Sequence, residues 1–311
     1  MKPDLIVANP FHPEIIAQLD ESFALHPLWE AKDRDAFLAP IADRVRAIAT
    51  FATPTPAAMI AALPRLEIIA AMSVGVDHID LAAARARGVA VTHAPDVLTD
   101  DVADLALALL LAVARQLVAA DRFVHEGRWL ERNPPLATKL GGARMGVVGL
   151  GRIGLAIARR AEAFGVEIVY HGPHEKPGTP YRYYADLRAM AGDVDYLMVA
   201  CPGGAATRHL VDAGVIAALG PKGAIINIAR GSVIDEAALV EALVAGRLAG
   251  AGLDVFADEP RVPPALFALD TVVLTPHVGS ATHATRRAMG QLMVDNLRAH
   301  FAGKPLLTRC A

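Results

Sequence analysis

Short apolar runs alternate with longer Ala- and Leu-rich stretches along most of the chain, and this alternation constrains the fold more than any other feature. In the first hundred residues the candidate strands are 4–8, 47–51, 66–72 and 89–92, and the helical stretches include 14–20 and 56–62. Strands that alternate with helices form parallel sheets, because each connection between parallel strands crosses the sheet. The sequence therefore predicts an α/β protein.

A second and more regular series of strands follows residue 143. Its six candidate strands are 144–149, 166–170, 196–200, 224–228, 250–254 and 272–275. Six strands separated by helices or loops are typical of a doubly wound sheet that binds a dinucleotide. After this series we expect an amphipathic helix over 281–302.

One long helix is expected to precede that series, over 101–126, followed by an irregular connector over 127–142. The helix nearly lacks a polar face around its run LALALLLAVA, and a helix that is apolar all round is buried. Two interpretations are open: a core helix of one chain, or a core helix that also packs against a second subunit.

The composition excludes several classes of protein. A length of 311 residues suggests two domains, and the formal net charge of −3 provides no broad field for nucleic acid or an anionic membrane. Cys201 and Cys310 are too few for a disulfide scaffold or a Cys-based zinc site. The longest apolar run, 105–114, is too short to span a bilayer, and the N-terminus does not resemble a signal peptide. We therefore expect a soluble cytoplasmic protein.

A glycine motif lies between the first strand and first helix of the second series. Gly149, Gly151 and Gly154 give the pattern G-x-G-x-x-G in RMGVVGLGRIG, with an apolar run before it and a helical stretch after it. The first glycine makes a tight turn, the second lets the backbone approach a pyrophosphate, and the third lets the helix pack closely on the strand. The motif predicts a dinucleotide site; the alternative is an ordinary strand-to-helix turn.

The end of the next strand bears on which dinucleotide is bound. NAD-specific enzymes usually have Asp or Glu there, to bind the ribose 2′-hydroxyl. Here His171 stands at the strand end, with His174, Glu175 and Lys176 beyond it. The missing carboxylate removes repulsion against a 2′-phosphate, and the His and Lys side chains could attract one, although Glu175 partly offsets Lys176. We therefore predict NADP(H) in preference to NAD(H). The alternative is a solvated loop and an enzyme that accepts either cofactor.

Three side chains with complementary chemistry each follow a separate strand. Arg230 comes directly after a buried strand, Glu259 lies in the loop after the next, and His277 follows the last. A guanidinium can hold a carboxylate with two hydrogen bonds, a His can donate a proton, and a Glu beside it favours the imidazolium. Alone, each would be a surface Arg, a loop acid or a structural His; together they predict the reduction of a 2-oxo acid.

Four segments, RMGVVGLGRIG, NIARGSVIDEAAL, GAGLDVFADEP and LTPHVGSAT, together resemble the D-isomer-specific 2-hydroxyacid dehydrogenase family, over about residues 73–282. The resemblance implies two doubly wound parallel-sheet domains with the active site in a cleft between them. These would be an NAD(P)-binding Rossmann domain over 98–277 and a smaller flavodoxin-like substrate domain made of 1–97 and 278–311. It also implies a homodimer through the 101–126 region.

The resemblance assigns roles to residues as well. Arg230 would bind substrate, Glu259 would orient His277, and His277 would donate the proton. Backbone N–H groups at Val74 and Gly75, in the segment MSVGVDHID, would bind the substrate carboxylate. A metal site at Asp77, His78 and Asp80 is not expected, because the family reaction needs none. The cofactor would be bound by Gly149, Gly151, Arg152, Ile153, Gly154, His171, His174, Cys201, Pro202, Thr207, Ile228, Ala229, Asp254 and Gly279; for Asp254, capping a loop is an equal alternative.

Within the family the chain is most similar to the glyoxylate and hydroxypyruvate reductases, which implies a small 2-oxo acid substrate. The sequence departs from this group in one respect. Members that prefer NADPH often have an Arg, or Ser-Arg, near the position of Pro173, and this chain has neither. Two alternatives remain open: a D-lactate or 3-phosphoglycerate type of dehydrogenase, and a non-catalytic protein that senses dinucleotides and acts as an interaction module. No nucleic-acid or membrane partner is expected.

Overall fold

The computed structural model describes residues 2–311, which form two compact units. The first unit contains the residues up to Leu98 together with Ser280–Ala311. The second contains Thr99–Gly279. Each unit is built on its own fully parallel sheet, as the alternation of strands and helices predicts.

The first unit has a five-stranded sheet in the order β2-β1-β3-β4-β5. This is the flavodoxin-like order, and the predicted fold of this unit is confirmed. The strands are β1 (Asp4–Val7), β2 (Ala24–Pro27), β3 (Val45–Thr50), β4 (Ile68–Ala71) and β5 (Ala90–Thr92). The helices are α1 (Pro13–Ser22), α2 (Arg34–Leu38), α3 (Ala57–Ala61), α4 (Leu81–Ala86) and α11 (His283–Phe301).

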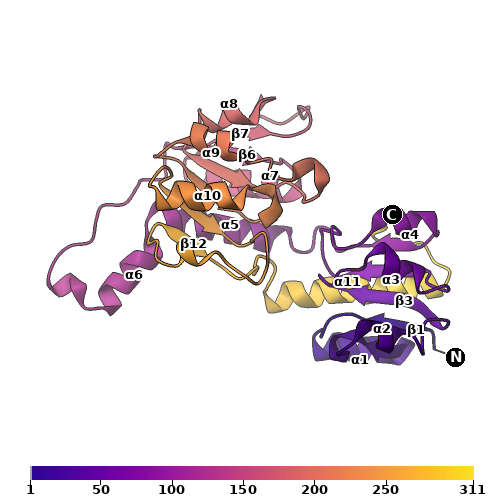
Figure 1. Ribbon diagram of the computed structural model, residues 1–311. Coiled ribbons are helices and arrows are strands. Elements are labelled where there is room, and N and C mark those ends of the chain that lie inside the picture. The colour runs from indigo at the N-terminus through magenta and orange to yellow at the C-terminus, as the bar shows by residue number, and fades with distance from the viewer. Residues whose placement is uncertain (1) are drawn as a thin grey trace. The chain divides into compact units, whose positions relative to one another are not determined.

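The C-terminal helix α11 completes the first unit by packing on β4 and α1 (Figure 1). Gly290 allows this close approach, because a Cβ there would lie 2.6 Å from the side chain of Ile15. The buried Asn296 accepts hydrogen bonds from the backbone N–H groups of Leu307 and Thr308. The last residues of the chain are thereby tied to α11 and reach β5, where Thr92 and Arg309 form an antiparallel bridge.

The second unit has a seven-stranded sheet in the order β12-β11-β10-β9-β6-β7-β8. Read from β8, this is the doubly wound dinucleotide-binding order 3-2-1-4-5-6 with one more parallel strand, which confirms the predicted Rossmann fold. The strands are β6 (Arg144–Val148), β7 (Glu167–His171), β8 (Arg182–Tyr184), β9 (Tyr196–Val199), β10 (Ala224–Asn227), β11 (Gly250–Leu253) and β12 (Val272–Leu274). The helices that follow β6 in this unit are α7 (Arg152–Glu162), α8 (Leu187–Ala191), α9 (Ala213–Leu219) and α10 (Glu236–Val244).

The prediction of a single long helix over 101–126 is wrong. The structure has two helices, α5 (Thr99–Ala114) and α6 (Leu117–His125), bent by 62° at a break where Gln116 takes a left-handed conformation. Helix α5 packs on β10, β11 and α7 and is mostly buried, whereas Phe123 is the one buried residue of α6. The helix breaks where the sheet no longer covers it, and α6 stands away from the sheet (Figure 1).

In the part of the chain that the structure describes, no single helix has the length and apolar character to cross a membrane. The bent pair α5 and α6 meets those two criteria only when its halves are taken together.

Candidate active site

The turn between β6 and α7 has the backbone that a pyrophosphate requires. Gly149 has a φ of +94°, and a Cβ there would lie 2.6 Å from the backbone of Cys201. A Cβ at Gly154 would lie 2.2 Å from the carbonyl oxygen of Gly149, so only glycine lets α7 start this close to the strand. Around Gly151 nothing lies within 4 Å of a Cβ position, which leaves open space at the helix N-terminus. A dinucleotide phosphate fits this cradle.

The turn lies where doubly wound sheets bind ligands. Strand β6 pairs with β7 on one side and with β9 on the other, so the order of the strands reverses there. Arg152 and Ile153 open α7, with Arg152 exposed and Ile153 half-buried. Ligands of such sheets bind beyond the carboxyl ends of the strands at this reversal.

The segment after β7 brings a cation to the glycine turn. His171 ends the strand, and its Nδ1 lies 2.9 Å from the carbonyl oxygen of Tyr184 in β8. The backbone N–H of Lys176 donates to the buried Tyr170 hydroxyl, and its Nζ donates to the carbonyl oxygen of Leu150 at 2.6 Å. His174 is exposed. Of the cations expected near a 2′-phosphate, Lys176 is therefore the one that is fixed on the glycine turn.

Residues after β9 and β10 form the rest of the predicted cofactor rim. Cys201 is buried, and burial raises the pKa of its thiol to about 11. The thiol is therefore un-ionised at neutral pH, and it acts as a small packing group under Gly149. The hydroxyl of Thr207 donates to the carbonyl oxygen of Pro202 at 2.7 Å, and Ile228 and Ala229 are buried at the end of β10.

Arg230 follows directly on that strand end and is half-buried. Its guanidinium donates to the carbonyl oxygen of Ala229 at 2.7 Å, and the Asn227 side chain donates to the Arg230 carbonyl oxygen. Gly203 packs against the aliphatic part of Arg230, where a Cβ would lie 2.7 Å from Cγ. The contacts with the Ala229 carbonyl oxygen and with Gly203 fix the direction of the side chain, and the Asn227 contact holds the Arg230 backbone.

The residue after Arg230 is a further position that sequence reasoning missed. A Cβ at Gly231 would lie 1.9 Å from the backbone of Phe256, which opens the loop carrying Glu259. The backbones of the Arg230 loop and the Glu259 loop are therefore in direct contact. The glycine of the motif ARG was the sequence signal for this position. Sequence alone does not show that this glycine contacts Phe256.

Glu259 and His277 form a hydrogen-bonded pair. His277 Nδ1 lies 2.8 Å from Glu259 Oε2, and the other carboxylate oxygen accepts from the backbone N–H of Phe256 at 3.1 Å. Burial disfavours the charged form of Glu259, but the hydrogen bonds from His277 and Phe256 and the charges of His277 and Arg230 outweigh it and lower its pKa. Glu259 is thus an anion next to the imidazole at neutral pH.

Asp254 holds the loop on which His277 stands. Its carboxylate is 2 % exposed and accepts three hydrogen bonds: from the Thr275 hydroxyl at 2.7 Å and from the backbone N–H groups of Val278 at 2.8 Å and Gly279 at 2.9 Å. The backbone N–H of His277 also donates to the Asp254 carbonyl oxygen. His277 has a φ of +53°, which is unfavourable for a side chain with a Cβ. The clamp keeps the His in this conformation, so Asp254 fills the loop-capping role.

In the first unit, the turn after β4 presents free backbone N–H groups. The Ser73 hydroxyl donates to the carbonyl oxygen of Gly75 at 2.7 Å, and the carbonyl oxygen of Val74 lies 3.1 Å from His93 Nδ1. Within residues 2–311, the N–H groups of Val74 and Gly75 have no acceptor. Successive free N–H groups in a turn form an anion-binding concavity, so this turn can bind a carboxylate.

The segment that follows this turn contains the acids and His that sequence alone could suggest as metal ligands. The Asp80 carboxylate accepts from the backbone N–H of Ala83 and caps α4. Among residues 2–311, no group of three His, Cys, Asp or Glu side chains is placed to hold a metal ion.

Comparison with known proteins agrees with this chemistry. Residues 107–279 match the NAD binding domain of the D-isomer specific 2-hydroxyacid dehydrogenases. Over 305 residues the chain is 50% identical to a hydroxyphenylpyruvate reductase from Plectranthus scutellarioides and 48% identical to a glyoxylate/hydroxypyruvate reductase from Arabidopsis thaliana, in each case covering 98% of this chain and 97% of the relative.

A solved structure is similar over the whole chain. The NADPH-dependent glyoxylate/hydroxypyruvate reductase from Sinorhizobium meliloti, in complex with NADP and malonate, is 45% identical with a TM-score of 0.93, over 100% of this chain and 97% of that one. These similarities confirm the resemblance seen in the sequence. The chain belongs to the D-isomer-specific 2-hydroxyacid dehydrogenase family and is an NAD(P)-dependent oxidoreductase.

Proposed function

We propose that the protein reduces a small 2-oxo acid, glyoxylate or hydroxypyruvate, to the D-2-hydroxy acid with NADPH. The observation that carries this proposal is the pair of His277 and an anionic Glu259, with the charge of Arg230 acting on the same carboxylate. The named activities of the Arabidopsis and Sinorhizobium relatives support the same substrate class.

The side chains divide the reaction among them. Arg230 binds the substrate and polarises its oxo group, which favours negative charge on that oxygen. His277 donates a proton to the oxygen, and the anionic Glu259 pairs with the imidazole and aligns it. The nicotinamide cofactor, when bound along the Gly149–Gly154 turn, supplies the hydride.

The free N–H groups of Val74 and Gly75 bind the substrate carboxylate in this proposal. Two N–H donors to a carboxylate are charge-assisted hydrogen bonds, which are stronger than those between neutral groups. They use no side chain, so they place the same requirement on every 2-oxo acid and leave selection among the acids to other residues.

Lys176 supports the preference for NADPH. Its ammonium group is fixed on the Leu150 carbonyl oxygen, in the turn that follows β6, and no carboxylate ends β7. The 2′-phosphate of NADP belongs beyond the end of this second strand. A fixed cation there favours the phosphate, whereas the acid that would bind a free 2′-hydroxyl is missing.

A second candidate substrate is an aromatic 2-oxo acid. The Plectranthus relative, at 50% identity, is named a hydroxyphenylpyruvate reductase. The same Arg230, Glu259 and His277 would perform that reaction, and the difference would lie in the groups that surround C3 of the substrate.

The segment that projects from the sheet of the second unit supports a homodimer. Leu130 is 95% exposed and Leu136 is 98% exposed, and Trp129 and Val124 are more than half exposed. Large apolar side chains gathered on a projecting arm are typical of a protein–protein interface. We propose that a second copy of this chain covers the arm formed by α6 and residues 126–136.

The test is NADPH oxidation, followed at 340 nm, with a panel of glyoxylate, hydroxypyruvate, 4-hydroxyphenylpyruvate, pyruvate and 3-phosphohydroxypyruvate. The same panel is repeated with NADH. The proposal expects the highest kcat/KM for glyoxylate or hydroxypyruvate with NADPH. Greater activity with the aromatic acid would move the assignment to the second candidate, and no turnover with any acid would refute the function.

A further inference from the structure

Two adjacent arginines near the N-terminus of helix α11 have different contacts. Arg286 and Arg287 are the fourth and fifth residues of the helix, close to its N-terminus, where the helix dipole disfavours cations. Arg287 is exposed and pairs with Glu14, with Nε 3.2 Å from the carboxylate. Within residues 2–311, the side chain of Arg286 has no ion pair or hydrogen bond. A cation without a counter-ion, at the unfavourable end of a helix, requires an explanation.

Arg286 is held by an aromatic ring instead. Its guanidinium carbon lies 4.4 Å from the ring centroid of Phe51, which places it over the face of that ring. The side chain is half-buried, and burial lowers the pKa of the guanidinium from its usual value. The stacked face is occupied by Phe51, and the donors along the edge of the planar fork remain available.

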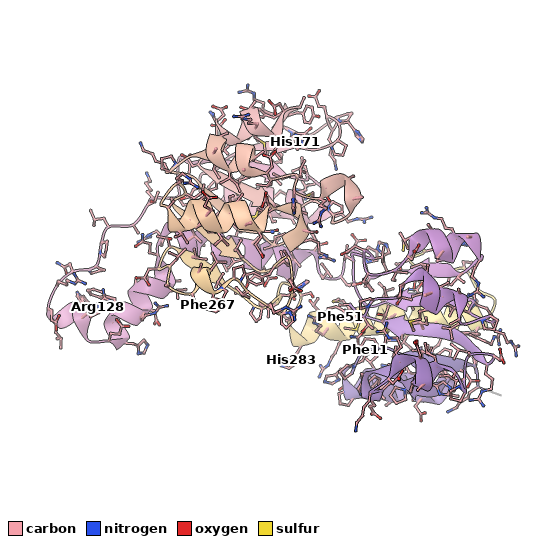
Figure 2. The ribbon with its side chains drawn as sticks, viewed as in Figure 1. Phe11, Phe51, Arg128, His171, Phe267 and His283 are labelled. Atoms are coloured by element: carbon pink, nitrogen blue, oxygen red, sulfur yellow. The ribbon has the colours of Figure 1, made fainter. Side chains whose placement is uncertain are left out.

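Phe51 is itself rigidly placed. Its backbone N–H donates to the Asn9 side chain at 2.8 Å, and the Thr53 hydroxyl donates to the Ala8 carbonyl oxygen at 3.1 Å. The loop after β3 is thus tied to the loop after β1. Figure 2 shows Phe51 beside the N-terminal part of α11, whose first residue, His283, is also labelled.

This stacked pair lies next to the turn that binds the substrate carboxylate in the proposed function. Thr50 pairs with Ala71 in adjacent strands, and the backbone N–H of Met72 donates to the Thr50 carbonyl oxygen at 2.7 Å. Phe51 therefore follows β3 at the level where Met72 leads into Ser73 and Val74. Neighbouring strands are about 4.8 Å apart, so Phe51 and the turn belong to one patch of the carboxyl edge of the sheet.

Two observations place Arg286 over this patch and not at the other edge. The C-terminal part of α11 lies at the amino edge of the sheet, where His300 Nε2 is 3.1 Å from the Glu67 carboxylate just before β4. Because α11 packs along β4, its N-terminal part reaches the carboxyl end of that strand. The cation–π contact with Phe51 agrees with this direction.

We propose that Arg286, stacked on Phe51, binds an oxygen atom on C3 of the 2-oxo acid and selects hydroxypyruvate-like substrates over pyruvate-like ones. This inference rests on the proposed function, because it takes the Val74–Gly75 turn as the carboxylate site. A guanidinium that has lost part of its hydration and has no protein acceptor gains most from a substrate that supplies one. Pyruvate has only a methyl group at that position.

The test compares hydroxypyruvate with pyruvate, which differ by the C3 hydroxyl alone, in wild type, R286M, R286K and R287Q. The measured quantity is the ratio of the two kcat/KM values, which is insensitive to a general loss of active protein. One hydrogen bond to a charged group corresponds to a ratio of about 10–100. We expect this ratio to collapse in R286M, to be partly retained in R286K, and to be unchanged in R287Q, which removes the neighbouring cation.

A binding measurement separates this inference from the proposed function. The affinities of D-glycerate and D-lactate, which differ by the same hydroxyl, are measured by calorimetry in the presence of NADP⁺. A preference for D-glycerate that R286M abolishes supports the inference even if turnover with the oxo acids is absent. An equal effect of R286M on both acids, no preference in wild type, or the same loss in R287Q would overturn it.

Discussion

Asp254→Asn removes one acceptor from the clamp on the His277 loop while keeping the size of the side chain. Each carboxylate oxygen faces one backbone N–H, that of Val278 or that of Gly279. An amide has only one oxygen, so in either orientation one of these N–H groups loses its acceptor and meets an NH₂ group. The Thr275 hydroxyl can rotate to adapt, but the backbone groups cannot.

The loss of stability in D254N follows from this one missing hydrogen bond. Losing one hydrogen bond to a buried charged group costs about 1.5–3 kcal/mol. For a unit of this size, about 2 kcal/mol lowers the Tm by about 4–8 °C. Because the clamp also holds His277 in its left-handed conformation, we expect kcat to fall by about 10–100-fold, since small displacements of a catalytic group are costly.

The assays are thermal unfolding of the protein without cofactor and steady-state reduction of glyoxylate. D258N is the matched control: Asp258 lies four residues away, is exposed and pairs with Arg261, and because exposed ion pairs contribute little to stability, we expect its Tm to stay close to that of wild type. If D254N unfolded at the wild-type temperature, the clamp would be refuted. If it then bound NADPH more weakly, the carboxylate would instead act on the cofactor.

Four further predictions concern the site and the arm. H277A should lower turnover by about 10²–10⁴-fold with dinucleotide binding, measured by fluorescence, retained; near-normal turnover would remove His277 from the mechanism. In E259Q the imidazole loses its anionic partner, so turnover should fall while NADPH binding is retained, and wild-type turnover would contradict the pairing. K176E should raise the KM for NADPH by at least about 10-fold and leave that for NADH nearly constant; equal effects on both would argue against a contact with the 2′-phosphate. L130D should shift the protein from dimer to monomer in analytical ultracentrifugation, whereas a monomeric wild type would refute the dimer.

Strong local patterns in the sequence predicted most strands of both sheets. The six candidate strands of the second unit all exist, because their apolar runs are buried on both faces. The seventh strand, β8, has three residues, Arg182–Tyr184, at the edge of the sheet, and its polar, half-exposed sequence carries no such pattern. Strand β2, Ala24–Pro27, is another half-buried edge strand and was missed for the same reason.

The helix break at Gln116 shows a different limit. Residues 101–126 have continuous helical spacing, and nothing at Arg115 or Gln116 breaks a helix locally. The break follows from tertiary structure, since α5 lies on the sheet and α6 does not. The candidate residues Arg230, Glu259 and His277 could be chosen from the sequence because they belong to motifs, and the structure pairs Glu259 with His277. The contacts of Lys176 with Leu150, of Gly231 with Phe256 and of Arg286 with Phe51 were not, because each joins segments whose separation in sequence gives no sign of contact.

The two sheets carry different kinds of group, and this has a consequence for how such proteins can diversify. His277, Glu259 and the glycine turn all follow strands of the seven-stranded sheet, whereas the Val74–Gly75 turn and the Arg286–Phe51 stack lie in the unit built on the five-stranded one. If the proposed roles hold, mutations in the smaller unit should change which acid is accepted and leave proton transfer intact. A chimaera that joins this second unit to a relative's first unit should therefore inherit its acid preference from one parent and its nucleotide preference from the other.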